Sequence, residues 1–297
     1  MTALIRSSLA ALAALLLLTA MPATAAAQTP SSPDEQALGI NLPSPDFTLA
    51  ALPTTLRMPS GKWAFRITHR FARPIAGTCP DTGPKPDGCG GFGAFVENFF
   101  GFDSAARTGF ELRYGLMPGT QLTVHRTNDR AIQLQAQTQL TPQATQPGTG
   151  PAFSLDVVAA IEGRNNFRED HAVSAGAILS HQMGERGAVF VHPTIVLNAN
   201  PLPDALTDDN HTVMLGLGGR VRLGQSKMYL VAEAAPRLAG FKPGVDHISF
   251  AFEHRSGGHM FQINVSNALG TTLRQVALGG PGNGDWYIGF NLSRRFF

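Results

Sequence analysis

The amino-acid sequence predicts an all-β protein that folds as a closed antiparallel β-barrel of about 12 strands, the type that spans outer membranes. Three observations support this fold class. After residue 60 apolar and polar residues alternate with a period of two, charged residues share the polar parity, and long connections alternate with short ones. The composition agrees with this fold class. Glycine makes up 32 of the 297 residues, roughly 11% against about 7% in average domains. Charged residues make up only 15%, against about 25%.

Residues 1–27 have the pattern of a secretory signal peptide. Arg6 precedes an apolar run at 9–20, and three alanines at 25–27 supply small residues for cleavage before Gln28. No later stretch has the roughly 18 consecutive apolar residues that a membrane-spanning helix needs. We therefore expect the chain to be exported without a helical anchor.

Two further parts follow the signal peptide. Residues 28–60 contain six prolines, which deny the backbone regular hydrogen bonding, so we expect a mobile, Pro-rich N-terminal segment in the periplasm. Residues 61–297 form the predicted β-barrel domain.

Each predicted strand separates an apolar face from a polar face. In residues 62–71, Phe65 and Ile67 share one parity and Arg66 and Thr68 the other, a separation that a helix would not give. Seven further segments alternate as clearly, and four alternate less cleanly. The clear segments are 110–114, 132–139, 153–162, 213–223, 248–253, 261–266 and 286–295, and the weaker ones are 119–127, 172–183, 187–197 and 227–236.

The connections between these strands differ in length from one end of the predicted barrel to the other. The long ones are 72–106, 163–171, 198–211, 237–246 and 268–283, and the short ones are 117–118, 184–186, 224–226 and 256–257. Two connections break the pattern, 128–129 by being short and 141–151 by being long. The asymmetry is typical of long extracellular loops and tight periplasmic turns. Since an open sheet edge is costly in hydrocarbon, the first and last strands should pair.

The chain ends on an amphipathic strand that closes with aromatic residues. Terminal strands of this type resemble the assembly signal of Gram-negative outer-membrane barrels, although here the apolar parity includes Phe296 rather than Phe297. We expect the outer membrane of a Gram-negative bacterium as the location, with outer-membrane lipid around the barrel and the barrel-assembly machinery as a partner of this strand. A soluble β-sandwich is the alternative, because its strands alternate too.

Charged residues of the polar parity are the candidates to line the lumen. The set comprises Lys62, Arg66, Arg70, Glu111, Arg113, Asp156, Glu162, Arg220, Arg222, Glu233, Glu253 and Arg295. In a wide lumen these charges would set ion selectivity, which predicts a channel or transporter for small polar solutes. In a narrow lumen they would pair and fill the interior, which predicts a structural or binding barrel that acts through its extracellular loops. Strand number does not decide, because about 12 lies between filled and open barrels.

No set of residues predicts an enzyme, a cofactor or a metal site. His254 and His259 flank a turn, but Ser266 lies roughly 20 Å from His259 along the next strand, too far for the nucleophile and base of a membrane hydrolase. Asp204, Asp208 and neighbouring residues lack the pattern of a calcium loop and are interpreted as a solvated acidic loop. The 23 basic and 21 acidic residues give no basic surplus for nucleic acid.

Cys79 and Cys89 are the only cysteines and lie in the first long connection. Because an exported chain meets an oxidising compartment, we expect them to form a disulfide.

Several stretches resemble a bacterial β-barrel family known as domain of unknown function 5777. They are 67–71, 98–103, 113–115, 230–237, 257–267 and 289–296, and together they span about residues 60–297. Gly257-Gly258-His259-Met260-Phe261-Gln262 and the terminal Arg294-Arg295-Phe296 are the most distinctive. The resemblance implies an exported barrel with no agreed activity, and the cysteine pair is not part of it.

Overall fold

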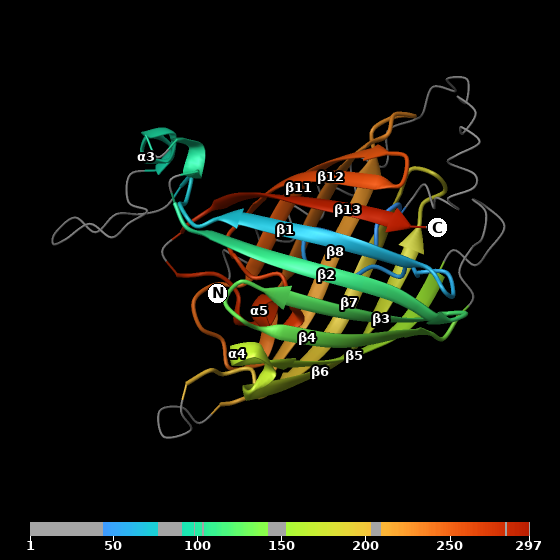
Figure 1. Ribbon diagram of the computed structural model, residues 1–297, viewed down its shortest axis with the longest axis horizontal. Helices are drawn as coiled ribbons and strands as arrows, with labels where there is room; N and C mark the ends of the chain where they lie inside the picture. Colours follow the sequence, from blue (N-terminus) through green and yellow to red (C-terminus); the bar gives the residue numbers. More distant parts are fainter. Residues whose placement is uncertain are drawn as a thin grey trace, which may run out of the picture.

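The computed structural model describes residues 44–76, 91–97, 99–102, 104–141, 153–202, 209–282 and 284–296. Its strands form one antiparallel sheet in which 12 strands close a barrel and one short strand, β10, lies outside the circle (Figure 1). The strands are β1 (Trp63–Phe71), β2 (Ala106–Met117), β3 (Thr120–Thr127), β4 (Ile132–Gln139), β5 (Phe153–Gly163), β6 (Glu169–Gln182), β7 (Gly187–Leu197), β8 (Thr212–Arg222), β9 (Met228–Ala235), β10 (Arg237–Gly240), β11 (His247–Ser256), β12 (His259–Ser266) and β13 (Tyr287–Phe296). Every predicted strand overlaps one of these, so the predicted fold class is confirmed.

The barrel closes between its first and last strands, as predicted. β1 pairs with β13 from Trp63 opposite Phe296 to Arg70 opposite Gly289. Past Pro236 the chain continues the line of β9 as β10, which pairs with the first residues of β8. Closure gives the backbone groups of the edge strands hydrogen-bond partners, which a sheet in hydrocarbon requires.

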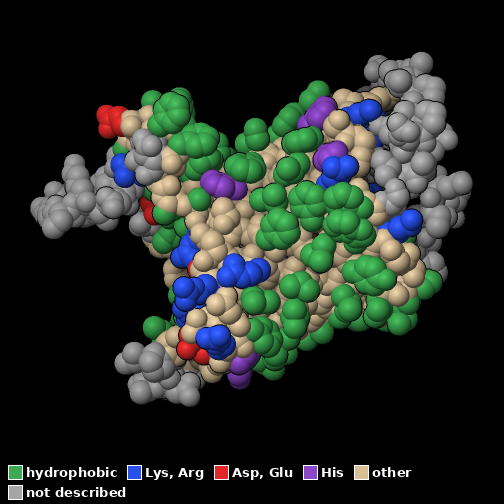
Figure 2. Space-filling model, viewed as in Figure 1, with side chains coloured by type: hydrophobic (Ala, Val, Ile, Leu, Met, Phe, Trp, Pro, Cys, Tyr) green, Lys and Arg blue, Asp and Glu red, His purple; other side chains and the backbone are tan. Residues whose placement is uncertain are grey.

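Side chains of the strands divide between the two faces as the alternation predicts. On β2, Phe110, Leu112 and Tyr114 are exposed, whereas Glu111 and Arg113 between them are buried inside the barrel. Figure 2 shows hydrophobic side chains covering the middle of the outer face formed by β12, β13 and β1 to β4. The barrel therefore has an apolar outside and a polar inside. Among the described residues no helix is long and apolar enough to span a membrane.

The two ends of the barrel differ. One end, here called the turn end, has tight connections at 118–119, 183–186, 223–227 and 257–258. The other, the loop end, carries the helices α3 (Gly91–Glu97), η1 (Phe99–Gly101), α4 (Arg164–Phe167) and α5 (Leu273–Leu278) (Figure 1). The two predicted exceptions to the length pattern recur. β3 and β4 are joined by a short connection, 128–131, at the loop end, and β4 and β5 by a long one, 140–152, at the turn end.

Of the predicted N-terminal segment the structure describes residues 44–60, and this part differs from the prediction. Residues 44–58, here called the inner hairpin, are buried inside the barrel instead of lying mobile outside it. The backbone folds back on itself with a bridge between Thr48 and Pro53, and Leu49 N donates to Leu52 O at 2.8 Å. Prolines do exclude a regular strand here, but side chains of the barrel wall satisfy the backbone groups instead.

Candidate functional site in the barrel lumen

Most of the predicted lumen residues do face the interior. Ten of the twelve are buried, namely Arg66, Arg70, Glu111, Arg113, Asp156, Glu162, Arg220, Glu233, Glu253 and Arg295. Lys62 and Arg222 do not line it. Lys62 precedes β1 at the turn end and is exposed, because the wall begins one residue later. Arg222 ends β8 at the same rim, where its Nε and Nη2 donate to the carbonyls of Ser226 and Gln225, each at 2.8 Å.

Two groups of charged side chains pair within the wall. On β1 and β2, Glu111 accepts from Arg113 Nη2 at 2.7 Å and lies 3.7 Å from Arg66 Nη1. Across β8 and β11, Arg220 binds both oxygens of Glu253, at 2.6 and 2.9 Å. Burial of these charges is compatible with folding because each carboxylate has a cationic partner.

Glu233 on β9 holds the tip of the inner hairpin. Its carboxylate accepts three consecutive backbone N–H groups, from Ala50 at 3.0 Å, Ala51 at 2.9 Å and Leu52 at 3.1 Å. His247 Nε2 lies 2.8 Å from the same carboxylate. Successive N–H groups that converge on one point form an anion-binding nest, and here a wall carboxylate fills the nest.

The opposite side of the hairpin tip contacts cationic and amide side chains. Ala50 O accepts from Arg66 Nη2 at 2.5 Å, Asn291 Nδ2 at 3.0 Å and Arg70 Nη2 at 3.4 Å. Three further wall side chains donate to hairpin carbonyls nearer the turn end: Gln262 to Leu49, Arg220 to Thr48, and Arg295 to Pro45. The wall thus contacts the first arm and the tip of the hairpin, residues 45–50, largely through their backbone carbonyls.

The second arm of the hairpin, which leads to β1, is held by two side-chain pairs and by a hydrogen bond to its backbone. Arg57 forms an ion pair with Asp156, with Arg57 Nε 2.9 Å from Asp156 Oδ2. Thr55 Oγ1 and Ser180 Oγ lie 2.7 Å apart, and Gln137 Nε2 donates to Thr54 O at 2.9 Å. Both arms therefore have anchors of their own.

Apolar residues of the hairpin tip fit against glycines of β8. A Cβ atom built at Gly218 would lie 2.4 Å from Leu49 Cδ1, and one at Gly216 would lie 3.1 Å from Leu52 Cδ1. Both leucines are almost fully buried. The missing side chains at these two glycines make the space that the leucines occupy.

Helix α5 covers part of the loop end. It packs against β6, β7, β8 and β11. Thr272 caps the helix, Leu273 N donates to Gln133 Oε1 at 2.9 Å, and Arg274 Nη2 donates to Asp170 Oδ1 at 2.8 Å. The connection that carries α5 was predicted only as a long loop.

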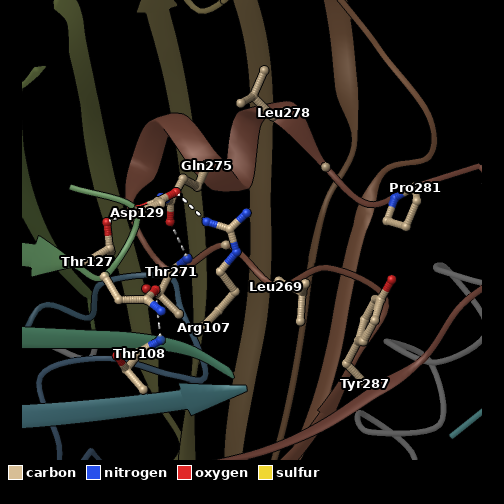
Figure 3. Close-up of a pocket in the computed structure, with 13 residues that line it drawn as sticks. Arg107, Thr108, Thr127, Asp129, Leu269, Thr271, Gln275, Leu278, Pro281 and Tyr287 are labelled. Carbon is tan, nitrogen blue, oxygen red and sulfur yellow. Dashed lines mark hydrogen bonds and ion pairs between the residues drawn. The ribbon is translucent and has the colours of Figure 1, made fainter. Parts of the chain in front are cut away.

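A pocket of about 290 Å³ opens beside α5 on the side of β2 and β3 (Figure 3). Arg107 Nη1 lies 2.7 Å from Asp129 Oδ2, and Gln275 reaches the same carboxylate from α5. Next to this pocket, here called the mouth pocket, is a cavity of about 10 Å³ that is lined by the hairpin, β2, β3, β4 and the α5 connection. Thr271 lines both spaces. The smaller space has room for about one water molecule beside the hairpin.

The other predicted features divide into those that can be located and those that cannot. His259 lies opposite Ser256 and Ser266 opposite Ser249, so this histidine and serine stand at opposite ends of the β11–β12 pair and form no catalytic pair. In the part of the chain that is described, no three His, Cys, Asp or Glu residues are placed to hold a metal ion. Cys79, Cys89 and most of the acidic loop fall outside the described residues, so the disulfide stays a prediction.

The inner hairpin and the wall residues that contact it were not predicted from the sequence. The signal was present, because Phe47, Leu49 and Leu56 are apolar residues within the Pro-rich segment and a Gly-rich run occurs in residues 216–219. Phe47 also lies against two arginine side chains, with Arg113 Cζ 5.0 Å and Arg295 Cζ 4.9 Å from its ring centre. An apolar segment with no strand of its own needs a binding surface, and the lumen supplies one.

The closed sheet, the apolar outer face and the polar interior define a membrane β-barrel protein. Residues 46–296 match the family described as "Membrane bound beta barrel domain (DUF5777)", and the chain belongs to that family. No curated protein sequence matches the chain.

Among solved structures, the chain is similar to mutants of the porin from Rhodopseudomonas blastica. Three of these show 11% sequence identity and a TM-score of 0.34. Each match covers 64% of this chain and 55% of the porin chain, so the similarity spans about half of the porin's length.

Proposed function

We propose that this protein is a gated conduit of the outer membrane for small polar solutes. In the state described here the inner hairpin closes the lumen, and the conduit opens when the hairpin leaves. One observation carries the proposal: a separate segment of the chain, the inner hairpin, fills a lumen whose wall is lined by polar and charged groups.

The polar wall supports a movable closure. A permanent plug could be held by an apolar interior, as in small barrels that side chains fill. Here the wall offers Arg66, Arg70, Glu233 and Asn291, which water can hydrate once the hairpin has gone. Loss of the hairpin therefore costs less free energy than exposing an apolar core of the same size.

The path of the hairpin also supports withdrawal. Pro45 and Asp46 lie beside Gly257 and Gly258 at the turn end, and Gly61, just after the hairpin, donates to Gly115 at that same end. The hairpin therefore enters and leaves through one end of the barrel. It can move out without threading a chain terminus through the barrel. By the lengths of the connections, the turn end is the periplasmic end.

A second candidate function is that of a permanently closed barrel that binds a ligand at its loop end. The mouth pocket of about 290 Å³ favours this candidate, because its volume is near the lower limit of ligand pockets. Both candidates place the protein in the outer membrane, and they differ in whether the hairpin moves.

Ion conductance in planar bilayers separates the two candidates. A Leu49→Asp/Leu52→Asp double variant places charges against Gly216 and Gly218 of β8 and leaves every strand residue unchanged. We expect stable conductance steps for this variant and none at steady state for the wild-type protein, because burial of an unpaired carboxylate is costly and drives the hairpin out. The matched control is Leu49→Ile/Leu52→Ile, which keeps the side chains against the β8 glycines apolar. The lumen of this control should stay closed. Absence of steps in a double variant whose hairpin has become accessible to protease would contradict the conduit.

A further inference from the structure

The lumen contacts the backbone of one residue of the inner hairpin, Ala50, from two sides. Glu233 accepts the N–H of Ala50, and Arg66, Arg70 and Asn291 donate to the carbonyl oxygen of the same residue. Arg66, Arg70 and Glu233 are each at most 4% exposed. The wall thus places one carboxylate and two guanidinium groups around a single residue.

These contacts involve the backbone of Ala50, so they do not depend on its methyl side chain. The nitrogen and the carbonyl oxygen of one residue are separated by Cα and the carbonyl carbon. A free α-amino acid has the same connection between its ammonium nitrogen and its carboxylate oxygens. Such a solute can therefore place a cation at Glu233 and an anion at the two arginines in the positions that Ala50 N–H and C=O now occupy. Charged groups would make these hydrogen bonds stronger than the neutral backbone groups of Ala50 do.

The two arginines also have donors to spare. Arg66 Nε and Arg70 Nε are buried and have no hydrogen-bond partner among the described residues. A carbonyl presents one oxygen atom, whereas a carboxylate presents two and can accept from both guanidinium groups. A carboxylate at this place would thus use donors that the hairpin leaves unpaired.

We propose that the lumen, once the hairpin has left, binds zwitterionic α-amino acids, with Glu233 at the ammonium group and Arg66 and Arg70 at the carboxylate. This inference rests on the proposed function and names its solute class. A simple anion would meet repulsion from Glu233, and a simple cation would meet repulsion from the arginines, so neither fits as well as a solute with both charges.

The test uses the full-length Leu49→Asp/Leu52→Asp variant in detergent, with L-alanine as the probe. Propionate, which lacks the amino group, and ethylamine, which lacks the carboxylate, are the matched controls. We expect calorimetric titration to give binding of L-alanine at least about tenfold tighter than of either control, the factor that one charge-assisted hydrogen bond supplies. Trypsin cleavage after Arg57 confirms in the same sample that the hairpin has left the lumen.

Substitutions in that background assign the site. Glu233→Gln should weaken L-alanine binding by about tenfold. Glu185→Gln should leave it unchanged, because Glu185 is a partly exposed carboxylate at the turn-end rim, 3.7 Å from Arg222, and does not contact the hairpin. Equal effects of the two substitutions would overturn the assignment to Glu233.

The outcomes for the solute class and for the conduit are distinguishable. If the variant conducts ions but binds L-alanine no better than propionate and ethylamine, the inference is overturned and the conduit stands. If it binds L-alanine selectively but never conducts, the site stands and the conduit fails. If it neither conducts nor binds, both are overturned.

Discussion

At Glu233 a buried carboxylate has as its main partners three N–H groups from a segment more than 180 positions earlier in the chain. These partners explain why a charge can lie inside the barrel at this position. Hydrogen bonds to a charged group contribute about 1.5–3 kcal/mol each, against about 1 kcal/mol for neutral pairs. The charge of this one residue therefore contributes strongly to holding the hairpin in the lumen.

Glu233→Gln should loosen the hairpin without opening the sheet. The amide keeps the size of the side chain but replaces charge-assisted hydrogen bonds with neutral ones. We expect trypsin cleavage after Arg57 to become at least about tenfold faster, which corresponds to about 1.4 kcal/mol in the free energy of hairpin release. Mass spectrometry of the N-terminal fragment measures the rate.

Glu185→Gln is the control for that measurement. Glu185 lies at the turn-end rim, 3.7 Å from Arg222, and is partly exposed. Its substitution removes a carboxylate without touching the hairpin, so cleavage should proceed at the wild-type rate. An unchanged rate for Glu233→Gln as well would show that the charge of Glu233 does not hold the tip.

At the scale of elements, the strands could be predicted from sequence and the inner hairpin could not. Strands such as β2 and β13 carry their own pattern, since each must present one face to lipid and one to the interior. The hairpin has no such period, because its backbone partners are side chains of distant strands. The prolines that mark the segment as irregular do not indicate whether irregular backbone lies in solvent or in a polar lumen.

The same distinction applies to the candidate site. The charges that line the lumen could be predicted from parity, but their partners could not. Arg220 pairs with Glu253 across two strands of the wall, whereas Asp156 pairs with Arg57 of the hairpin. Lys62 and Arg222 share the inward parity yet lie at the rim, because parity sets the direction of a side chain and not its depth.

Gly218→Ala tests how β8 and the inner hairpin fit together. The added methyl group would lie 2.4 Å from Leu49 Cδ1. Overpacking of this kind costs about 1–3 kcal/mol, and the hairpin can relieve it by leaving the lumen. We expect faster trypsin cleavage after Arg57 with little change in the thermal unfolding of the barrel.

Gly93→Ala is the matched control, because a Cβ atom at Gly93 meets nothing within 4 Å. It should leave cleavage unchanged. If Gly218→Ala lowered the unfolding temperature and left the hairpin protected, the glycines of β8 would serve the wall rather than the hairpin.

In the whole molecule, the outer and inner faces of the barrel meet different requirements. The closed sheet and its apolar outside satisfy the membrane, and this part of the fold follows from alternation alone. The polar inside is left free to contact something other than lipid. In the structure described here that contact is the inner hairpin, and α5 covers part of the opposite end, on the side of β6, β7, β8 and β11.

A reversible crosslink between the inner hairpin and the wall tests whether movement of the hairpin opens the lumen. Thr55 Oγ1 and Ser180 Oγ lie 2.7 Å apart, so cysteines at these two positions are within reach of a disulfide. The crosslink is placed in the Leu49→Asp/Leu52→Asp background, and each single cysteine variant serves as a control for effects of oxidation on Cys79 and Cys89. We predict no conductance steps when the Thr55→Cys/Ser180→Cys protein is oxidised and stable steps after reduction in the same bilayer. Conductance that is equal before and after reduction, with the crosslink verified by mass spectrometry, would show that the hairpin does not gate the lumen.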